Sequence, residues 1–353
     1  MSVEPLAHSA PEPGREPQLY RDHVGAVRRG AELRAARMTA YQRDKAAATA
    51  LFDAVVDAAI AHDLGKLDPE TQQQLRQGRG TRLTWDHVDA GVAYSRAHGA
   101  YTAAWLVRSH HAPGLPSLPV HFQDPTDRKL RGRRNDTEDE ARHAEQVSRT
   151  DAHLEVLVEA HSAACGVHTP KRGKAMHGLS MRLALSALVD ADHADTAPFD
   201  TGWAPPEEPP PRWEERLAAL DAYVADLGKR DGGERDGLRR DFYRACRDQG
   251  PAAALVACEG PVGIGKTTAV TAYLLRRAIA TGARRLFIVA PYTAILSQTA
   301  ERLREALVLE DERDRPDAIV AEHHHRASFD HVSSRDLAAL WSAPVVLTTS
   351  VQF

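Results

Sequence analysis

The sequence predicts a protein of two domains: a helical domain over residues 1–197 and an α/β domain over residues 213–353, joined by a linker over residues 198–212. Three observations predict this division. Apolar residues recur at helical spacing in the first part, six prolines gather between residues 198 and 211, and short apolar runs alternate with helical stretches afterwards. The length of 353 residues agrees with two domains of about 150 residues each.

In the first domain, apolar residues lie three and four positions apart, for example over residues 47–61 and 179–189. Runs rich in valine and isoleucine, which are typical of strands, are missing between Tyr20 and Asp195. We therefore expect the first domain to be all-α.

The second domain begins with two predicted helices, over residues 213–228 and 238–248. Apolar runs of strand length then alternate with helical stretches, which favours a parallel sheet covered by helices. The chain stops directly after the fourth of these runs, so we expect this α/β domain to be incomplete. The four predicted strands lie at residues 252–258, 285–290, 318–320 and 344–348.

Composition and charge exclude several classes of protein. The 45 basic and 49 acidic residues give a net charge of −4, so nucleic-acid binding would require local patches. Three cysteines without a CxxC pair exclude a disulfide scaffold and a thiolate zinc site. Neither an apolar run of about 20 residues nor a signal peptide is visible, so we expect a cytoplasmic protein without membrane contact. Eighteen histidines against seven phenylalanines indicate metal chemistry.

A phosphate-binding loop is predicted at residues 260–267, where Gly-Pro-Val-Gly-Ile-Gly-Lys-Thr fits the pattern G-x-x-x-x-G-K-[ST]. A predicted strand precedes this loop and a predicted helix follows it. Glycines let backbone N–H groups turn toward phosphate oxygens, and the start of the helix adds its positive dipole end. We expect the Lys266 ammonium to bridge the β- and γ-phosphates of ATP and the Thr267 hydroxyl to bind Mg²⁺. The expected nucleotide-binding residues are Gly260, Gly263, Gly265, Lys266, Thr267 and Thr268.

Magnesium at such a loop also needs a carboxylate from the end of a neighbouring strand, and no acidic motif of this kind follows Thr348. The acidic stretch at residues 139–143 lies upstream of the loop and has no apolar strand before it. We therefore expect the nucleotide site to be half present.

Histidine and aspartate recur at the predicted ends of separate helices. His62 and Asp63 follow an apolar helix, His110 and His111 end another, and either Asp190 or Asp192 could serve at the end of a third. Neutral imidazole and carboxylate groups can bind one divalent metal, or bridge two that are about 4 Å apart and cleave a phosphoester. A single histidine of this kind is more often a solvated helix residue, but the ordered set favours a dinuclear site. His23 and His87 have similar helical surroundings.

These motifs, in this order, resemble the CRISPR-associated helicase–nuclease of type I interference systems, in which an HD-type nuclease domain precedes a superfamily 2 helicase. The first domain matches at Asp22-His23, residues 61–66, Asp86-His87, residues 109–111 and residues 188–196. The second matches at the phosphate loop and at residues 290–299, 322–324 and 346–353. The resemblance implies an all-α HD-type domain followed by an incomplete RecA-like domain.

The resemblance also implies the residues of the sites. Asp63 and Lys66 would be catalytic, and two divalent ions (Mn, Ni, Co, Fe or Mg) would bind alongside ATP with Mg²⁺. Backbone and hydroxyl groups of two loops would contact the DNA phosphates without reading bases. The implied metal ligands are His23, His62, Asp63, His87, His110, His111 and Asp192, the last by its place in the family's final motif. The implied DNA-contacting residues are Pro291, Thr293, Thr348 and Thr349.

The sequence departs from the family at three points. Val262 stands where the family usually has threonine, and both the DEAH-type box and the second RecA-like domain are absent. Since ATP is hydrolysed between two such domains, we expect that this chain alone does not translocate and that it is a truncated or split product.

The function expected from the sequence is metal-dependent cleavage of single-stranded DNA in antiviral defence, joined to ATP binding. The partners would be a CRISPR RNA-guided surveillance complex and a separate chain that supplies the missing helicase half. Two alternatives remain open: an HD-type phosphohydrolase that acts on nucleotides, and a non-catalytic remnant that binds nucleotide or a partner protein.

Overall fold

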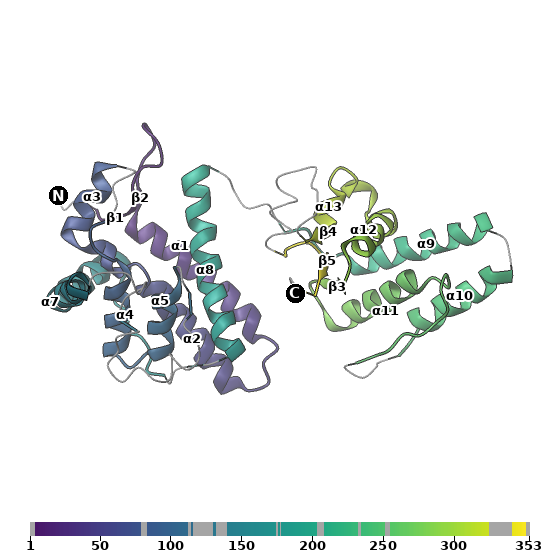
Figure 1. The fold of residues 1–353 in the computed structure, drawn as a ribbon, viewed down its shortest axis with the longest axis horizontal. Helices are drawn as coiled ribbons and strands as arrows, with labels where there is room; N and C mark the ends of the chain where they lie inside the picture. Colours follow the sequence, from purple (N-terminus) through teal and green to yellow (C-terminus); the bar gives the residue numbers. More distant parts are fainter. Residues whose placement is uncertain are drawn as a thin grey trace. The chain divides into compact units, whose positions relative to one another are not determined.

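A computed structural model describes residues 4–78, 83–111, 114–115, 130–131, 140–173, 176, 178–202, 208–231, 234–250, 255–324 and 341–350. The chain divides into two compact units, Met1–Ala204 and Pro205–Phe353 (Figure 1). Each unit has its own hydrophobic core.

The first unit is helical, as the apolar spacing predicts. Helix α1 packs extensively against both α2 and α8. The three helices lie side by side, with alanine and leucine side chains between them (Figure 1). Gly30 of α1 permits the close approach of α8, because a Cβ there would lie 3.2 Å from the Cβ of Ala191. The helices are α1 (Tyr20–Thr39), α2 (Lys45–Ala61), α3 (Pro69–Gln77), α4 (Val88–Ala97), α5 (Tyr101–Ser109), α7 (Glu140–Cys165) and α8 (Gly178–Thr201), with a 3-10 turn η1 (Leu64–Leu67).

Two short strands precede the first helix and amend the all-α prediction. Strand β1 (Leu6–His8) pairs antiparallel with β2 (Gln18–Leu19), and β1 contacts α1, α3 and η1. Strands of three and two residues are too short to show a periodic pattern in the sequence.

Helix α8 extends into the segment that the sequence predicts as a linker. It includes Pro198 and ends at Thr201, so the first four residues of 198–212 are helical. Pro198 lies in the last turn of the helix, where its missing N–H costs only one helical hydrogen bond.

The second unit contains a three-stranded parallel sheet in the order β3–β5–β4 among its described residues. The central strand β5 (Val345–Thr349) is buried along its whole length, since β3 (Leu286–Ala290) and β4 (Val320–His323) pair with its two edges. Helix α12 (Thr293–Leu307) packs against all three strands, and α9 (Trp213–Asp231) packs against α11 (Lys266–Thr281) and α12. The predicted parallel α/β arrangement is confirmed.

Polar side chains fix the remaining elements of this unit, α10 (Glu234–Arg247), η2 (Glu310–Glu312) and α13 (Pro316–Ile319). The fully buried guanidinium of Arg216 donates to both carboxylate oxygens of Glu312, at 2.7 and 2.9 Å, and to the Leu307 carbonyl at 2.9 Å. Pairing of this kind is required for a buried charge. It attaches α9 to the end of α12 and to η2.

Two predicted strands differ in the structure. Residues 318–320 are divided between α13 and β4, which begins at Val320. Of the predicted strand 252–258, the last four residues are described; they form no ladder with the described strands, and the Leu255 side chain is 91% exposed. An apolar run forms a strand only where it finds a hydrogen-bonding neighbour, and residues 255–258 pair with none of the described strands.

We expect the substitution Asp44→Ala to destabilise the first unit by about 1 kcal/mol, the usual cost of losing a helix N-cap. The Asp44 carboxylate accepts hydrogen bonds from the backbone N–H groups of Ala46 and Ala47, both at 3.0 Å, at the start of α2. Urea unfolding followed by circular dichroism measures the change. Asp44→Ser retains a capping oxygen and should unfold almost like the unmodified chain, whereas equal losses in both variants would contradict the capping role.

Candidate metal centre and nucleotide-binding loop

The His-Asp pair of the sequence lies where helix α2 ends. His62 is the C-cap residue of α2, and Asp63 precedes the turn η1. The Gly65 N–H in this turn donates to the His87 carbonyl oxygen at 3.0 Å, and a Cβ on residue 65 would lie 2.4 Å from that oxygen. Glycine is therefore required here by close contact, and this contact brings the start of α4 beside Asp63.

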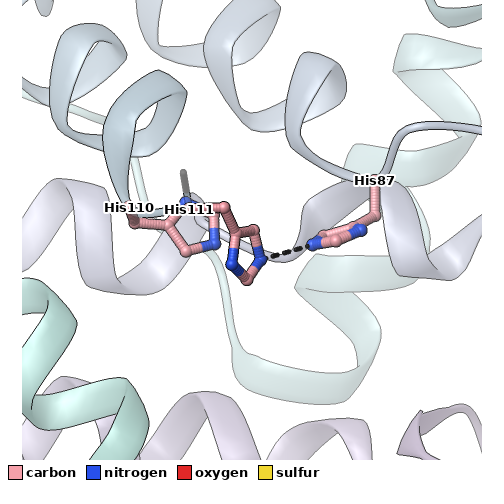
Figure 2. Close-up of side chains that lie close together, drawn as sticks. All are labelled: His87, His110 and His111. Atoms are coloured by element: carbon pink, nitrogen blue, oxygen red, sulfur yellow. Dashed lines mark hydrogen bonds between the residues drawn. The ribbon is translucent and has the colours of Figure 1, made fainter. Parts of the chain in front are cut away.

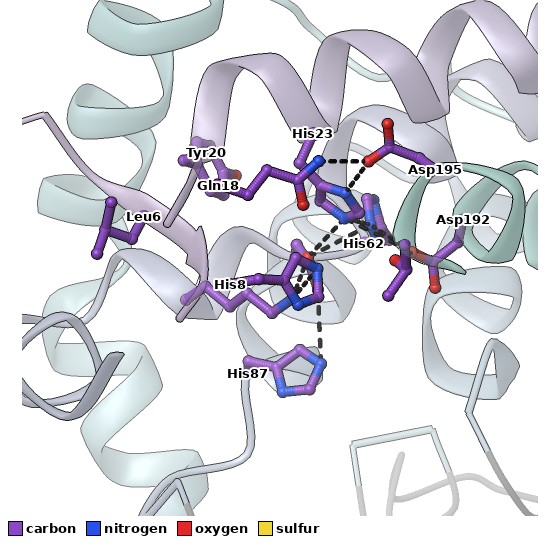
Figure 3. A network of polar contacts seen from close by, with 12 residues as sticks. Leu6, His8, Gln18, Tyr20, His23, His62, His87, Asp192 and Asp195 are labelled. Atoms are coloured by element: carbon purple, nitrogen blue, oxygen red, sulfur yellow. Dashed lines mark hydrogen bonds and ion pairs between the residues drawn. The ribbon is translucent and has the colours of Figure 1, made fainter. Parts of the chain in front are cut away.

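A first group of metal-binding side chains comes from three helices: His23 of α1, His62 after α2, and Asp192 of α8 (Figure 3). All three are buried. His23 Nε2 lies 3.2 Å from His62 Nε2 and 3.5 Å from Asp192 Oδ1. Asp190, the other aspartate considered from the sequence, is exposed and accepts a hydrogen bond from Ser186 instead.

A second group consists of His87 before α4 and His110 and His111 after α5 (Figure 2). His87 Nε2 and His111 Nε2 lie 3.1 Å apart. Two nitrogens that bind one metal at about 2.1 Å each are roughly 3.0–3.4 Å apart for bond angles of about 90–110°. One imidazole pair in each group has this spacing.

The buried carboxylate of Asp63 lies between the two groups. Its Oδ2 is 3.1 Å from His23 Nε2 and 3.5 Å from His62 Nε2, while its Oδ1 is 3.5 Å from His87 Nε2. The Lys66 ammonium lies 2.6 Å from the same Oδ2. One oxygen toward each group is the arrangement that a carboxylate bridging two metals requires.

Hydrogen bonds behind the imidazoles fix which nitrogen faces the centre. The Nδ1–H groups of His62 and His110 donate to the carbonyl oxygens of Ala59 and Val107, at 2.8 and 2.6 Å. Nε2 of both rings therefore carries the free lone pair. His110 Nε2 is buried and has no hydrogen-bond partner among the described residues, as expected for a nitrogen that can bind a metal. His23 Nδ1 lies 2.7 Å from Asp195 Oδ2.

Burial and charge set the protonation states that metal binding needs. Burial lowers the pKa of His62 and His110, and it lowers the pKa of His87 to about 4 although Asp63 opposes the shift. Burial would raise the pKa of Asp63, but the charge of Lys66 and the hydrogen bond with His23 hold that pKa well below its usual value. Neutral imidazoles around an ionised carboxylate fit divalent first-row metals.

His23 is the exception, because it gains a proton rather than losing one. Burial opposes its protonation, yet hydrogen bonds with Asp195 and Asp63 prevail and raise its pKa to about 9. Below pH 9 the ring is therefore protonated, and a metal that binds Nε2 would have to displace a proton.

We expect metal binding at neutral pH to release one proton from His23. Because protonated His23 competes with the metal, the affinity should rise with pH up to about 9 and fall roughly tenfold for each pH unit below that value. Titration calorimetry at pH 7 in two buffers that differ in ionisation enthalpy counts the released protons. The same binding enthalpy in both buffers would contradict the prediction, and His23→Gln should abolish the buffer dependence.

The predicted phosphate loop lies immediately before α11. Gly263 and Gly265 have φ angles of +81° and +89°, in the left-handed region that favours glycine. Lys266 begins the helix, so the free N–H groups of the first turn are available to an anion. In the structure the Lys266 ammonium donates to the carbonyl oxygens of Gly260 and Pro261, at 2.6 and 3.1 Å. The phosphates of a bound nucleotide would replace these two carbonyl oxygens as the hydrogen-bond acceptors of Lys266.

The two threonines of the loop differ in their surroundings. The Thr268 hydroxyl donates to the Gly265 carbonyl at 2.9 Å, and the side chain of Thr267 is half-buried. The Thr267 hydroxyl thus stays the candidate for Mg²⁺.

The predicted DNA-contacting residues separate into two pairs. Pro291 is exposed and Thr293 begins α12 with a half-buried side chain. Thr348 and Thr349 are buried in β5, and the Thr348 hydroxyl donates to the His323 carbonyl at 2.9 Å. The Thr348 hydroxyl is thus used within the sheet, and DNA contact by all four residues stays a prediction.

Sequence reasoning missed two side chains at the metal centre. Asp195 lies one helical turn after Asp192, a spacing that indicates the same face of α8. His8 gives no such signal, since it lies on a three-residue strand far from the other motifs. Burial and the Lys66 charge lower the pKa of His8 to about 3.

Among the helices that the structure describes, we find none with the length and apolar character needed to cross a membrane. The two units define a class of fold: a helical unit with histidine and aspartate gathered at its helix ends, and an α/β unit with a phosphate-type loop and a parallel sheet. No family model and no curated protein matches the chain.

Solved structures do match, and the fold is Cas3-like. The crystal structure of T. fusca Cas3 superposes with a TM-score of 0.51 and 18% identity, covering 98% of this chain and 43% of that chain. T. fusca Cas3-AMPPNP gives a TM-score of 0.47 and 18% identity, over 98% of this chain and 44% of that one. The chain spans less than half the length of these proteins, and at this identity the likeness concerns the fold.

Proposed function

We propose that the chain is a divalent-metal-dependent nuclease of the CRISPR-associated helicase–nuclease class, which cuts single-stranded DNA in its first unit and binds ATP with Mg²⁺ at the loop of its second. The observation that carries the proposal is the Asp63 carboxylate, whose two oxygens face two separate groups of buried metal-binding side chains. The Cas3-like fold and the order of the motifs support DNA as the substrate. On this proposal, the partners are single-stranded DNA and an RNA-guided surveillance complex.

The residues of the centre would divide the work of phosphodiester hydrolysis. Metal ions bound at the two groups would supply a hydroxide nucleophile and neutralise charge on the phosphate. The protein holds the imidazoles in one tautomer through carbonyl acceptors, so that no reorganisation is needed when the metals bind. Lys66, held 2.6 Å from Asp63, keeps that carboxylate ionised and would add a positive charge near a phosphate bound at the centre.

The alternative is a phosphohydrolase that acts on nucleotides, since the same donor set can serve phosphomonoesters. The phosphate loop in the same chain favours the nuclease, because coupling to an ATP-binding unit has a use on long DNA that it lacks on small nucleotides. This alternative differs from the proposal in substrate and in nothing else at the centre.

One experiment separates the two. The full chain is incubated with circular single-stranded DNA, or with deoxynucleotides, in the presence of Mn²⁺, Ni²⁺, Co²⁺, Fe²⁺ or Mg²⁺, or of EDTA. We expect at least one metal to support linearisation of the circle without ATP and EDTA to stop it. Asp192→Asn should lose this cleavage, and the matched exposed variant Asp190→Asn should retain it. Hydrolysis of deoxynucleotides with intact circles would establish the alternative.

A further inference from the structure

The N-terminal strand β1 is attached directly to the turn that carries Lys66. The buried amide of Gln72 in α3 accepts from the Leu6 N–H at 2.8 Å and donates to the Leu6 carbonyl, also at 2.8 Å. The same amide donates to the Lys66 carbonyl at 2.7 Å. One side chain thus fixes the position of β1 relative to the turn that carries Lys66, and His8 is the last residue of this strand, after a register irregularity that follows Leu6.

The imidazole of His8 reaches the centre from this strand (Figure 3). Its ring meets the ring of His23 edge-on, with centroids 4.8 Å apart, and its Nε2 lies 3.4 Å from the Lys66 ammonium. One potential ligand atom from each of His8, His23 and Asp63 lies within 4.8 Å of the other two. These are three residues from separate elements, brought together only by the tertiary fold.

We propose that His8 is a further metal ligand, which would bind beside His23 and Asp63 and so add the N-terminal strand to the first group of ligands. The proposal rests on the function proposed above, since it concerns the same centre. Three side chains and one oxygen of Asp63 offer four donors there, while Mn²⁺, Fe²⁺, Co²⁺ and Ni²⁺ accept five or six. A neutral imidazole adds a donor without adding a third negative charge to the group.

The competing explanation is that His8 only accepts a hydrogen bond from Lys66. The separation of 3.4 Å is long for such a bond. The two roles respond differently to glutamine, whose amide oxygen can still accept from Lys66 but is a much weaker ligand than imidazole for these metals.

Calorimetric titration of the full chain with Ni²⁺ tests the proposal without any activity measurement. We expect His8→Gln to weaken the affinity of one site by at least about tenfold, which is the smallest usual effect of disturbing the surroundings of a metal. His98→Gln is the matched control, because His98 is also half-buried and donates to the Tyr94 carbonyl outside the centre. His23→Gln is the positive control.

Each outcome has one meaning. Unchanged Ni²⁺ affinity in folded His8→Gln, with a loss in His23→Gln, would overturn the role of His8 and leave the proposed function standing. Failure of the unmodified chain to bind any of Ni²⁺, Mn²⁺, Co²⁺, Fe²⁺ and Mg²⁺ would overturn the proposed function itself.

If the His8→Gln variant does not fold, hydrogen exchange of the unmodified chain provides a second test of the proposal. Coordination by His8 would couple β1 to the metal, so addition of Ni²⁺ should slow amide exchange in the peptide that contains Leu6 and His8 by at least about tenfold. Exchange there that does not respond to bound Ni²⁺ would refute coordination by His8.

Discussion

Substitution of Asp63 by asparagine should reduce DNA cleavage by a factor on the order of 10³ or more. Metal ions contribute several kcal/mol of transition-state stabilisation, and each 1.36 kcal/mol corresponds to about tenfold in rate. Asp63 is the residue with one oxygen toward each donor group, so its loss should affect both metal sites. Asparagine keeps the shape and one acceptor oxygen for Lys66, but it removes the negative charge that two cations would share.

The measurement is single-turnover cleavage of circular single-stranded DNA, together with the metal content of the purified variant. Circular dichroism and thermal unfolding in EDTA should show that Asp63→Asn is folded. Asp190→Asn, on exposed α8 surface, provides the control with the same chemical change. A folded Asp63→Asn chain that cuts at the normal rate would exclude a bridging role.

The fold could be predicted from sequence wherever a pattern extended over several turns or was confirmed by spacing. Helical periodicity predicts α8 because its buried residues repeat every three to four positions, and it predicts α2 because an apolar pattern extends over several turns. Such a pattern cannot show strand β1, where three residues are held by the Gln72 amide from elsewhere in the chain. The described residues 255–258, the last part of the apolar run predicted as a strand, show the converse: hydrophobicity alone does not supply the neighbour that a strand requires.

In the candidate centre, too, the residues of local patterns could be predicted from the sequence, whereas those placed by tertiary contacts could not. His62-Asp63 and His110-His111 are visible in the sequence because adjacent ligands at a helix end form a local pattern. The sequence does not show why residue 65 must be glycine, because the reason is its close contact with the His87 backbone. His8 is likewise placed by tertiary contacts alone.

The substitution Lys266→Ala should weaken the affinity of the phosphate loop for ATP roughly 100-fold. A hydrogen bond to a charged group contributes about 1.5–3 kcal/mol, and the ammonium would contact two phosphates, so a loss of about 3 kcal/mol follows for Lys266→Ala. The ammonium is already within the loop, on the carbonyl oxygens of Gly260 and Pro261, and needs only to change partners. Gly263 and Gly265 have the positive φ angles that let successive backbone N–H groups turn toward phosphate oxygens.

Equilibrium binding of a fluorescent ATP analogue with Mg²⁺ measures this effect. Arg276→Ala is the matched control: it removes a positive charge from the exposed face of the same helix α11, away from the loop. We expect this control to bind the analogue normally, because an exposed charge far from the phosphates is screened by solvent. Equal losses in both variants would mean that the analogue responds to the general charge of the helix, and normal binding by Lys266→Ala would mean that the loop does not hold the phosphates.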